Sequence, residues 1–338
     1  MLLNVIYHGD CLELFHLVPD RSQHLVIADP PYNLGQDFGN NSDKMVYSDF
    51  VRFSRQWLTE CLRVLAPTGT LMVYGLTRLN WFLWGCLRNY AAAPDKQLRE
   101  LIWHYSNKNV PNLQFYQPAH ENIIVFCADP TRRTFNRDDL RQPYESNYPK
   151  SGGRVRAATP GRFGSRPSIY RAHERGAAPR DVLVVDKAPP VLQGGVLKCA
   201  TLAGGSGRER VVGPNGEKHP TQKPLRLTRW LILGSSNPGD NIFIPFSGSG
   251  TEALVAYDEK RRFIGFELNA NYVKMSRSRF EASGFATEYV ELNETKAWRA
   301  VGRGERTEEA DERLEIDRPV HADPADSMQV EEERKDAK

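Results

Sequence analysis

The sequence lacks the features that mark several protein classes. No apolar run approaches the ~20 residues that a membrane-spanning helix needs. The first residues form no basic segment and soon reach Asp10, so we expect no signal peptide and a cytoplasmic location. The cysteines are scattered without the spacing of a zinc or redox motif, and we expect buried, reduced thiols. They are Cys11, Cys61, Cys86, Cys127 and Cys199.

Charge is distributed unevenly along the chain, although the net charge is only +3. Residues 130–218 carry 17 basic and 8 acidic side chains, whereas residues 302–338 carry 7 basic and 13 acidic ones. The basic middle predicts a polyanionic partner, with a solvated basic loop as the alternative. The acidic end is poor in apolar and aromatic residues and is expected to be disordered.

The most informative stretch is Asp29-Pro30-Pro31-Tyr32, which follows a predicted buried strand over residues 25–28. The prolines end the strand in a stiff turn. The Asp29 carboxylate and the Pro30 carbonyl could each accept one N–H of an exocyclic amino group on a nucleobase, which frees the nitrogen lone pair to attack a methyl sulfonium. Tyr32 offers a face on which a flipped base can stack. The alternative is a proline-rich turn with a surface aspartate.

A second region, over residues 242–267, predicts a nucleotide-type site. A short strand is followed by the glycine-rich loop from Phe246 to Thr251, whose glycines allow the backbone to approach a ligand closely. Glu267 follows the next strand, where a carboxylate can bind a ribose diol. Alone this pattern is weak, because nicotinamide-dependent enzymes share it.

A third segment, His219-Pro220-Thr221-Gln222-Lys223-Pro224, opens a predicted helix. Along the chain the catalytic turn comes first, the basic region next and the cofactor glycines last, and with this order the three motifs resemble those of the permuted β class of DNA amino-methyltransferases that use S-adenosylmethionine. The resemblance covers about residues 3–130 and 217–285. It implies transfer of a methyl group to N6 of adenine in double-stranded DNA, with base flipping and no metal. One departure is Ile244, because the family usually has an acidic residue there, and its loss could weaken the hold on the cofactor's amino group.

The alternation of predicted strands and helices indicates an α/β fold. The resemblance specifies a Rossmann-like, doubly wound and mostly parallel sheet with a target-recognition insertion, as in class I methyltransferases. We expect a catalytic half over residues 1–129, a recognition region over 130–218, a cofactor-binding half over 219–300 and a disordered charged tail over 301–338.

Several local features are also predicted. Ser48 is expected to cap a helix that ends at residues 67–69. Trp81 and Trp84 are interpreted as packing residues in a second helix. Residues 33–47 are expected to form a mobile loop beside the catalytic turn, and residues 181–185 a strand.

The resemblance assigns the candidate site residues. The catalytic set is Asp29, Pro30, Pro31 and Tyr32. The cofactor set is Asp10, Cys11, Asp29, His219, Thr221, Lys223, Phe246, Ser247, Gly248, Ser249, Gly250, Thr251 and Glu267; within it, Asp10 is expected near the cofactor's adenine and Lys223 near its methionine carboxylate. The DNA-binding set is Asn33, Lys44, Arg154, Arg156, Arg162, Arg166 and Arg171.

Three other functions stay open at this point. N4-cytosine methylation uses the same geometry, although that group tends to place Ser where this chain has Asp29. A nicotinamide-dependent oxidoreductase would explain only the second region. A catalytically inactive DNA-binding protein is suggested only by Ile244. Double-stranded DNA is the expected partner and implies association with the nucleoid. The resemblance leaves open a homodimer, and it leaves open whether the protein is an orphan or has a cognate restriction endonuclease.

Overall fold

The computed structural model describes most of the chain. The described residues are 2–36, 38, 43–105, 119–142, 154–156, 168–170, 173–184, 212–213, 216, 218–292 and 294–303. Their largest feature is a ten-stranded sheet with the order β11-β12-β1-β10-β9-β2-β3-β5-β4-β8. The central strands from β1 to β3 pair in parallel, whereas β5, β11 and β12 pair antiparallel to their neighbours. The expected mostly parallel α/β fold is confirmed.

The strands of this sheet are β1 (Val5–His8), β2 (Gln23–Ala28), β3 (Leu65–Gly75), β4 (Leu98–His104), β5 (His120–Cys127), β8 (Val182–Val184), β9 (Asn241–Ile244), β10 (Arg262–Glu267), β11 (Phe285–Leu292) and β12 (Thr295–Arg303). A separate hairpin contains β6 (Arg154–Arg156) and β7 (Ser168–Tyr170). The helices are α1 (Cys11–Leu14), α2 (Tyr47–Val64), α3 (Thr77–Tyr90), α4 (Pro94–Gln97), α5 (Leu225–Ser235), α6 (Thr251–Asp258) and α7 (Ala270–Ala282), with short 3₁₀ helices at Phe15–Leu17 and Arg137–Leu140.

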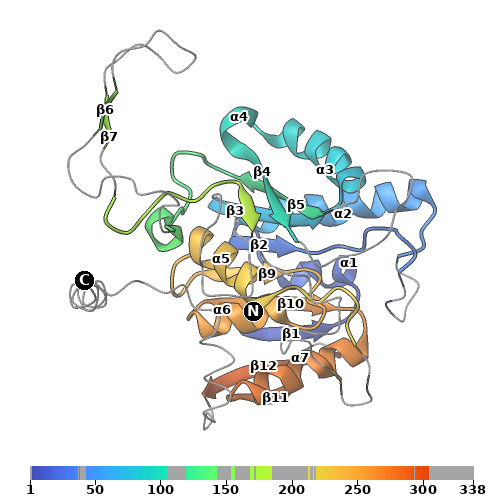
Figure 1. Cartoon of the computed structure of the whole chain (residues 1–338). Helices are drawn as coiled ribbons and strands as arrows, with labels where there is room; N and C mark the ends of the chain where they lie inside the picture. The colour runs from blue at the N-terminus through green and yellow to red at the C-terminus, as the bar shows by residue number, and fades with distance from the viewer. Residues whose placement is uncertain are drawn as a thin grey trace, which may run out of the picture.

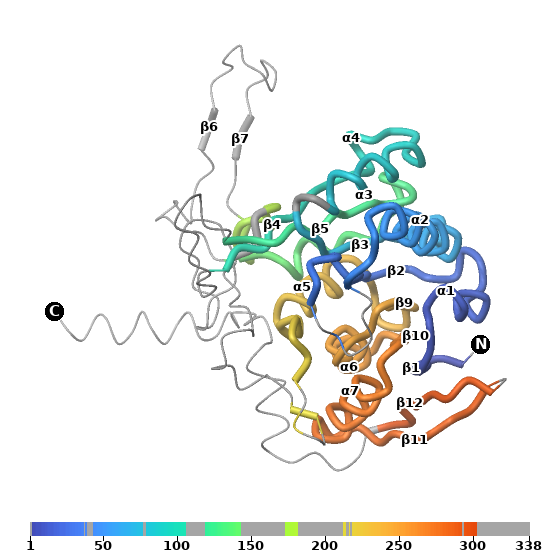
Figure 2. Tube along the Cα trace, turned by 90° about the vertical axis from the view of Figure 1, so that its right-hand side faces the viewer, coloured from blue at the N-terminus to red at the C-terminus, as the bar shows by residue number. Residues whose placement is uncertain are grey.

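Helices cover both faces of the sheet, so the molecule has three layers (Figure 1). One buried cluster joins the sheet to α5, α6 and α7, and a second joins it to α1, α2 and α3. Figure 2 shows α5, α6 and α7 on one side of the strands and α1 and α2 on the other. Because both faces are covered, the central strands are apolar along almost their whole length, as residues 25–28 illustrate.

The strand order brings the distant motifs together. β2 and β9 are neighbours, with Leu25 opposite Ile242 and Val26 opposite Phe243. β9 is paired in turn with β10, and β10 with β1. Parallel strands end at the same edge of a sheet, so the residues that follow β1, β2, β9 and β10 meet there.

Some local predictions are wrong. Helix α2 starts at Tyr47, and Val46, which makes no side-chain cap bond, occupies the capping position expected for Ser48. The same helix ends at Val64 and residues 67–69 lie inside β3. Trp81 is 79% exposed and Trp84 is also exposed, so these side chains are not core residues; the apolar face of α3 is formed instead by Leu79, Leu83 and Leu87. A helical repeat of apolar residues does not reveal which side of the helix faces the sheet.

The C-terminal hairpin of β11 and β12 was not predicted. The adjacent residues Ala297 and Trp298 on β12 are both buried, one in each of the two buried clusters, whereas Tyr289 on β11 is 69% exposed. β12 runs to Arg303, three residues into the range expected for the charged tail. The rest of that tail, residues 304–338, lies outside the described residues.

The recognition region is described only in part. The strand predicted over residues 181–185 is confirmed, since β8 pairs in parallel with β4 and extends the main sheet.

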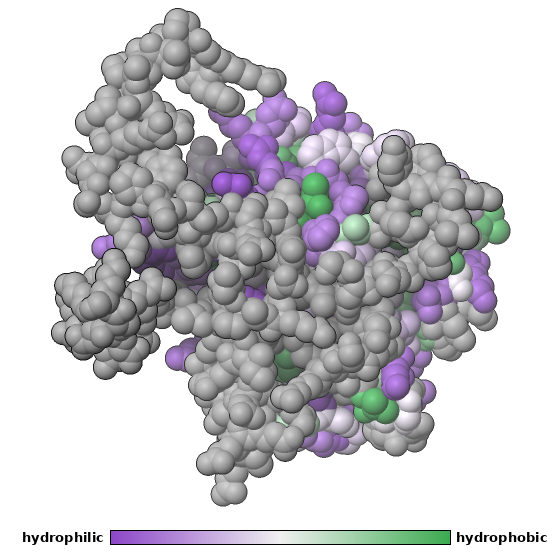
Figure 3. Space-filling model, viewed as in Figure 1, coloured by the Kyte–Doolittle hydropathy of each residue, from purple (hydrophilic) through white to green (hydrophobic). Residues whose placement is uncertain are grey.

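On the face seen in Figure 3, described residues are mostly hydrophilic, with hydrophobic ones between them. Among the described residues, no helix has the length and apolar character needed to cross a membrane.

Candidate active site

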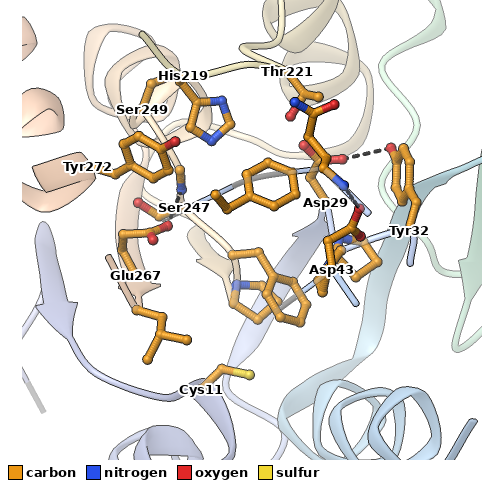
Figure 4. Close-up of a pocket in the computed structure, with 18 of the residues that line it drawn as sticks. Cys11, Asp29, Tyr32, Asp43, His219, Thr221, Ser247, Ser249, Glu267 and Tyr272 are labelled. Atoms are coloured by element: carbon orange, nitrogen blue, oxygen red, sulfur yellow. Dashed lines mark hydrogen bonds between the residues drawn. The ribbon is translucent and has the colours of Figure 1, made fainter. Parts of the chain in front are cut away.

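A cavity of about 440 Å³ opens at the carboxyl ends of β1, β2, β9 and β10. All three sequence motifs line it, as do Asp10 and Cys11 after β1. In Figure 4, Asp29 and Tyr32 lie on one side of this cavity, and Ser247, Glu267 and Tyr272 lie on the other. The topology therefore places the catalytic and cofactor candidates in one site.

The Asp29 carboxylate is held from two sides. The Tyr32 hydroxyl donates to Oδ1 over 2.8 Å, and the ammonium of Lys223 donates to Oδ2 over 2.5 Å (Figure 4 for Tyr32). Burial raises the pKa of the Tyr32 hydroxyl well above its ordinary value, and the neighbouring Asp29 charge raises it further. Tyr32 is thus a neutral hydrogen-bond donor that fixes the orientation of the carboxylate.

Lys223 lines the cavity and has a partner within the protein. It forms an ion pair with Asp29 and is 4% exposed, while its contact with the carboxylate of the cofactor's methionine stays a prediction. Burial lowers the pKa of the ammonium, while the charges of Asp29, Glu121 and Glu252 raise it more, and the net shift is upward. Lys223 is therefore a buried cation between the two halves of the site.

The glycine loop adopts the left-handed backbone that its sequence favours. Gly248 has φ +51° and Gly250 has φ +77°. A Cβ on Gly248 would lie 2.8 Å from Nε2 of His219, and one on Gly250 would lie 2.7 Å from Cβ of Ser276. Glycine is required here both for the backbone conformation and for the close approach of these neighbours. The loop then leads into α6 at Thr251.

Glu267 lies at the end of β10 and points into the cavity from the side opposite Tyr32 (Figure 4). Its Oε2 accepts a hydrogen bond from the Gly248 amide over 2.7 Å, and its Oε1 accepts one from the Asn269 amide over 2.8 Å. Burial raises its pKa to about 7, although these amide bonds lower it. The carboxyl is thus fixed in direction beside the glycine loop, where it can accept from a diol.

Asp10 serves as the predicted helix cap. Its Oδ1 accepts from the Leu12 amide over 2.8 Å at the start of α1. It also lines the cavity with Cys11, whose thiol pKa is raised mainly by burial. Both residues therefore lie at the cavity, where their contact with a cofactor stays a prediction, and the thiol is not activated as a nucleophile.

The segment after Tyr32 is tied down at its base. Asp43 accepts from the backbone amides of Asn33, Leu34 and Gln36, over 2.5, 2.9 and 2.8 Å. The Asn33 side chain donates to Met45 O over 3.0 Å and accepts from the Met45 amide over 2.7 Å. Asn33, expected to contact DNA, thus uses both ends of its amide to close the loop. These five hydrogen bonds, with a sixth from the Gly35 amide to Asp43 O, hold the described base of a segment predicted to be mobile.

The same segment reaches across to the cofactor side. The Asn269 side chain donates to Phe38 O over 2.7 Å. The Phe38 ring lies 6.0 Å from the His219 ring, which is 4.5 Å from the ring of Tyr272 on α7. These aromatic rings form one wall of the cavity. Four residues of this cavity were not predicted, because no motif or pattern in the sequence marks them: Phe38, Asp43, Glu252 and Tyr272.

The DNA-binding candidates are only partly visible. Lys44 is exposed beside the cavity segment. Arg154 and Arg156 belong to β6, and their side chains are outside the described set. Arg162, Arg166 and Arg171 lie outside the described residues. This set stays a prediction.

Comparison with known proteins identifies the family. The N6/N4 methyltransferase family model, described as DNA methylase, matches residues 23–278. That range contains Asp29 to Tyr32, the His219 segment and the glycine loop. The chain belongs to this family of DNA methylases.

Individual relatives agree with this assignment. The chain is 30% identical to the DNA adenine methyltransferase YhdJ of Escherichia coli (strain K12) over 291 residues, covering 84% of this chain and 85% of that protein. It is 28% identical to the type II methyltransferase M.HpaI of Haemophilus parainfluenzae over 263 residues, which cover 78% of this chain and 69% of that protein. A solved structure of the cytosine-N4-specific PvuII DNA methyltransferase has a TM-score of 0.53 at 18% identity. The match covers 81% of this chain and 85% of that one and supports the fold.

Proposed function

We propose that the protein transfers a methyl group from S-adenosylmethionine to N6 of adenine in double-stranded DNA. The observation that carries this proposal is the shared cavity, in which Asp29 and Tyr32 lie opposite Ser247 and Glu267 (Figure 4). One side offers acceptors for an amino group, and the other offers a glycine cradle with a diol-binding carboxyl. A nicotinamide-dependent oxidoreductase needs the second side but not the first.

The residues on the cofactor side fit S-adenosylmethionine. Glu267 would accept from the ribose hydroxyls, Asp10 lies beside the expected adenine end, and Gly248 lines the same cavity with its backbone alone. His219, Thr221 and the serines beside the glycines complete this wall. When bound, the sulfonium supplies the electrophilic methyl group.

Asp29 is the residue that would act on the target base. Its carboxylate and the Pro30 carbonyl would accept the two N–H bonds of the adenine amino group, which directs the nitrogen lone pair toward the methyl donor. Each carboxylate oxygen has two acceptor positions, so Asp29 can take up this bond while Tyr32 stays in place. The interaction strengthens as the nitrogen becomes tetrahedral, and this favours the transition state over the ground state.

Adenine is preferred over cytosine for two reasons. Asp29 is present where the cytosine group tends to have Ser, and a relative that matches 84% of the chain is named an adenine methyltransferase. The matched N4-specific structure shares the fold at 18% identity and does not bear on the base. Incubation of duplex DNA with labelled S-adenosylmethionine, followed by nucleoside analysis, tests the choice. N6-methyl-2′-deoxyadenosine is the expected product, and N4-methyl-2′-deoxycytidine would contradict the assignment.

We also place the recognition region at residues 130–218, with the catalytic half before it and the cofactor half after it. The support is the charge of this region and the way β8 adds to the sheet edge beyond β4. A homodimer and a cognate restriction endonuclease are not needed for the chemistry described, since all the proposed groups come from one chain.

A further inference from the structure

The end of β9 supplies no carboxyl to the cavity. Its last residue is Ile244, which is 1% exposed, and Pro245 and Phe246 follow it as part of the cavity lining. The methionine part of the proposed cofactor carries an ammonium group. A buried ammonium needs an acceptor, and a carboxylate is the strongest one that a protein offers.

Glu252 is a buried carboxyl in the right part of the site. It lies in the first turn of α6, directly after the glycine loop, is 5% exposed and lines the same cavity. Its Oε1 has no hydrogen-bond partner among the described residues. Buried polar atoms are seldom left unpaired, and a bound ligand can supply the missing partner of one that lines a cavity.

The other carboxyls around the cavity have partners already. Asp10 caps α1, Asp43 accepts from the loop amides, and Glu267 accepts from Gly248 and Asn269. Asp29 is bonded to Tyr32 and Lys223. The charge of Glu121, on β5, raises the pKa of Tyr32 and of Tyr105, so this carboxyl belongs to the target-base side. We propose that Glu252 binds the α-ammonium group of the cofactor's methionine moiety. Position 244, which is Ile in this chain, has no carboxyl that could bind this group. This inference rests on the function proposed above.

The charges around Glu252 agree with this role. The ionised groups that act on it are Asp29 after β2, Lys223 before α5 and Arg279 on α7. Burial and the Asp29 charge raise its pKa to about 7, while Lys223 and Arg279 lower it. An ammonium bound to Oε1 would stabilise the ionised form and offset the cost of burying it.

Calorimetry on the full-length protein tests the contact from both sides. The ligands are S-adenosylhomocysteine and its deaminated analogue, which keeps the carboxylate but has hydrogen in place of the amino group. Removing the amino group should weaken binding to the wild-type protein by about tenfold or more. Glu252→Gln should weaken S-adenosylhomocysteine to a similar degree and bind the two ligands almost equally. The exposed Glu281→Gln on α7 is the matched control and should behave as wild type.

A Glu252→Gln variant that still separates the two ligands as the wild type does would overturn the proposal. A wild-type protein that binds neither ligand would instead overturn the cofactor assignment, so the two failures are distinct. If the variant does not fold, the pH dependence of binding to the wild-type protein tests the contact. The preference of the wild type for S-adenosylhomocysteine over the deaminated analogue should fall several-fold from pH 8 to pH 6, as Glu252 takes up a proton. A preference that is constant over this range would contradict the contact.

Discussion

The ammonium of Lys223 lies 2.5 Å from Oδ2 of Asp29, although the two residues are 194 positions apart in the chain. This ion pair joins the turn after β2 to the segment before α5, and so connects the two halves of the site. Lys223 also lies 4.9 Å from the centre of the Tyr74 ring and 5.8 Å from that of Tyr32. The charge of the catalytic carboxylate is therefore balanced from within the protein.

The ion pair predicts a specific pattern of stability. Lys223→Met should lower the free energy of unfolding by about 3–5 kcal/mol, because it leaves the Asp29 carboxylate, which is only 17% exposed, without its cation. The double variant Lys223→Met/Asp29→Asn should recover much of this loss, since both charges are removed. Urea denaturation measures both, with the exposed Lys274→Met on α7 as the control. A double variant no more stable than Lys223→Met would show that the pair is not coupled.

Tyr32 is expected to act through two separate features. Tyr32→Phe keeps the ring for stacking but loses the 2.8 Å hydrogen bond to Asp29, and turnover should fall about tenfold, as for a bond to a charged acceptor. Tyr32→Ala loses the ring as well and should be slower still. Single-turnover methylation at saturating DNA separates these effects. Equal rates for the two variants would mean that the ring has no role.

The raised pKa of Glu267 predicts how stability depends on pH. The folded protein holds this proton up to about pH 7, whereas the ordinary value is 4.5. The group's contribution to stability is therefore largest below pH 4.5 and is lost as the pH rises through 7. Glu267→Gln cannot ionise, so relative to wild type it should gain about 1–3 kcal/mol between pH 5 and pH 8. Denaturation at the two pH values checks this, and a constant difference would contradict the assignment.

The basic recognition region predicts a salt effect on DNA affinity. Arg162 and Arg166, if each contacts a phosphate, should together account for about two units of the log–log slope of affinity against salt. The double alanine variant should lose that part of the slope, while Arg299→Ala on β12, at the other end of the sheet from β8, should keep it. Titrations at several salt concentrations decide the matter. An unchanged slope in the double variant would place the DNA-binding face elsewhere.

Much of the fold could be predicted because local signals were strong. β2 and β9 are short apolar runs, and α7 starts directly after Asn269, whose side chain accepts from the Asn271 amide as an N-cap. Local signals were weaker where packing decides the outcome. Trp81 has a helical spacing typical of a core residue but faces outward. The edge strand β11 exposes the adjacent Glu288 and Tyr289, so it lacks the regular alternation that marks a strand in a sequence.

The candidate site could be predicted as far as its motifs extend. Asp29, Gly248 and Glu267 each follow a strand, and parallel pairing brings such positions together. The partners of these residues could not be predicted, since they depend on three-dimensional contacts. No pattern in the sequence indicated the ion pair between Lys223 and Asp29, and Glu252 carried no signal until its burial was known.

The central claim is that Asp29 accepts a hydrogen bond from the target amino group as the methyl group is transferred. The most direct test measures transfer of labelled methyl to duplex DNA by Asp29→Ala and Asp29→Asn, together with DNA affinity. Both variants should lose most of their turnover while DNA binding survives, because the bond is strongest in the transition state. Asp29→Ala methylating adenine at a near wild-type rate would contradict the account.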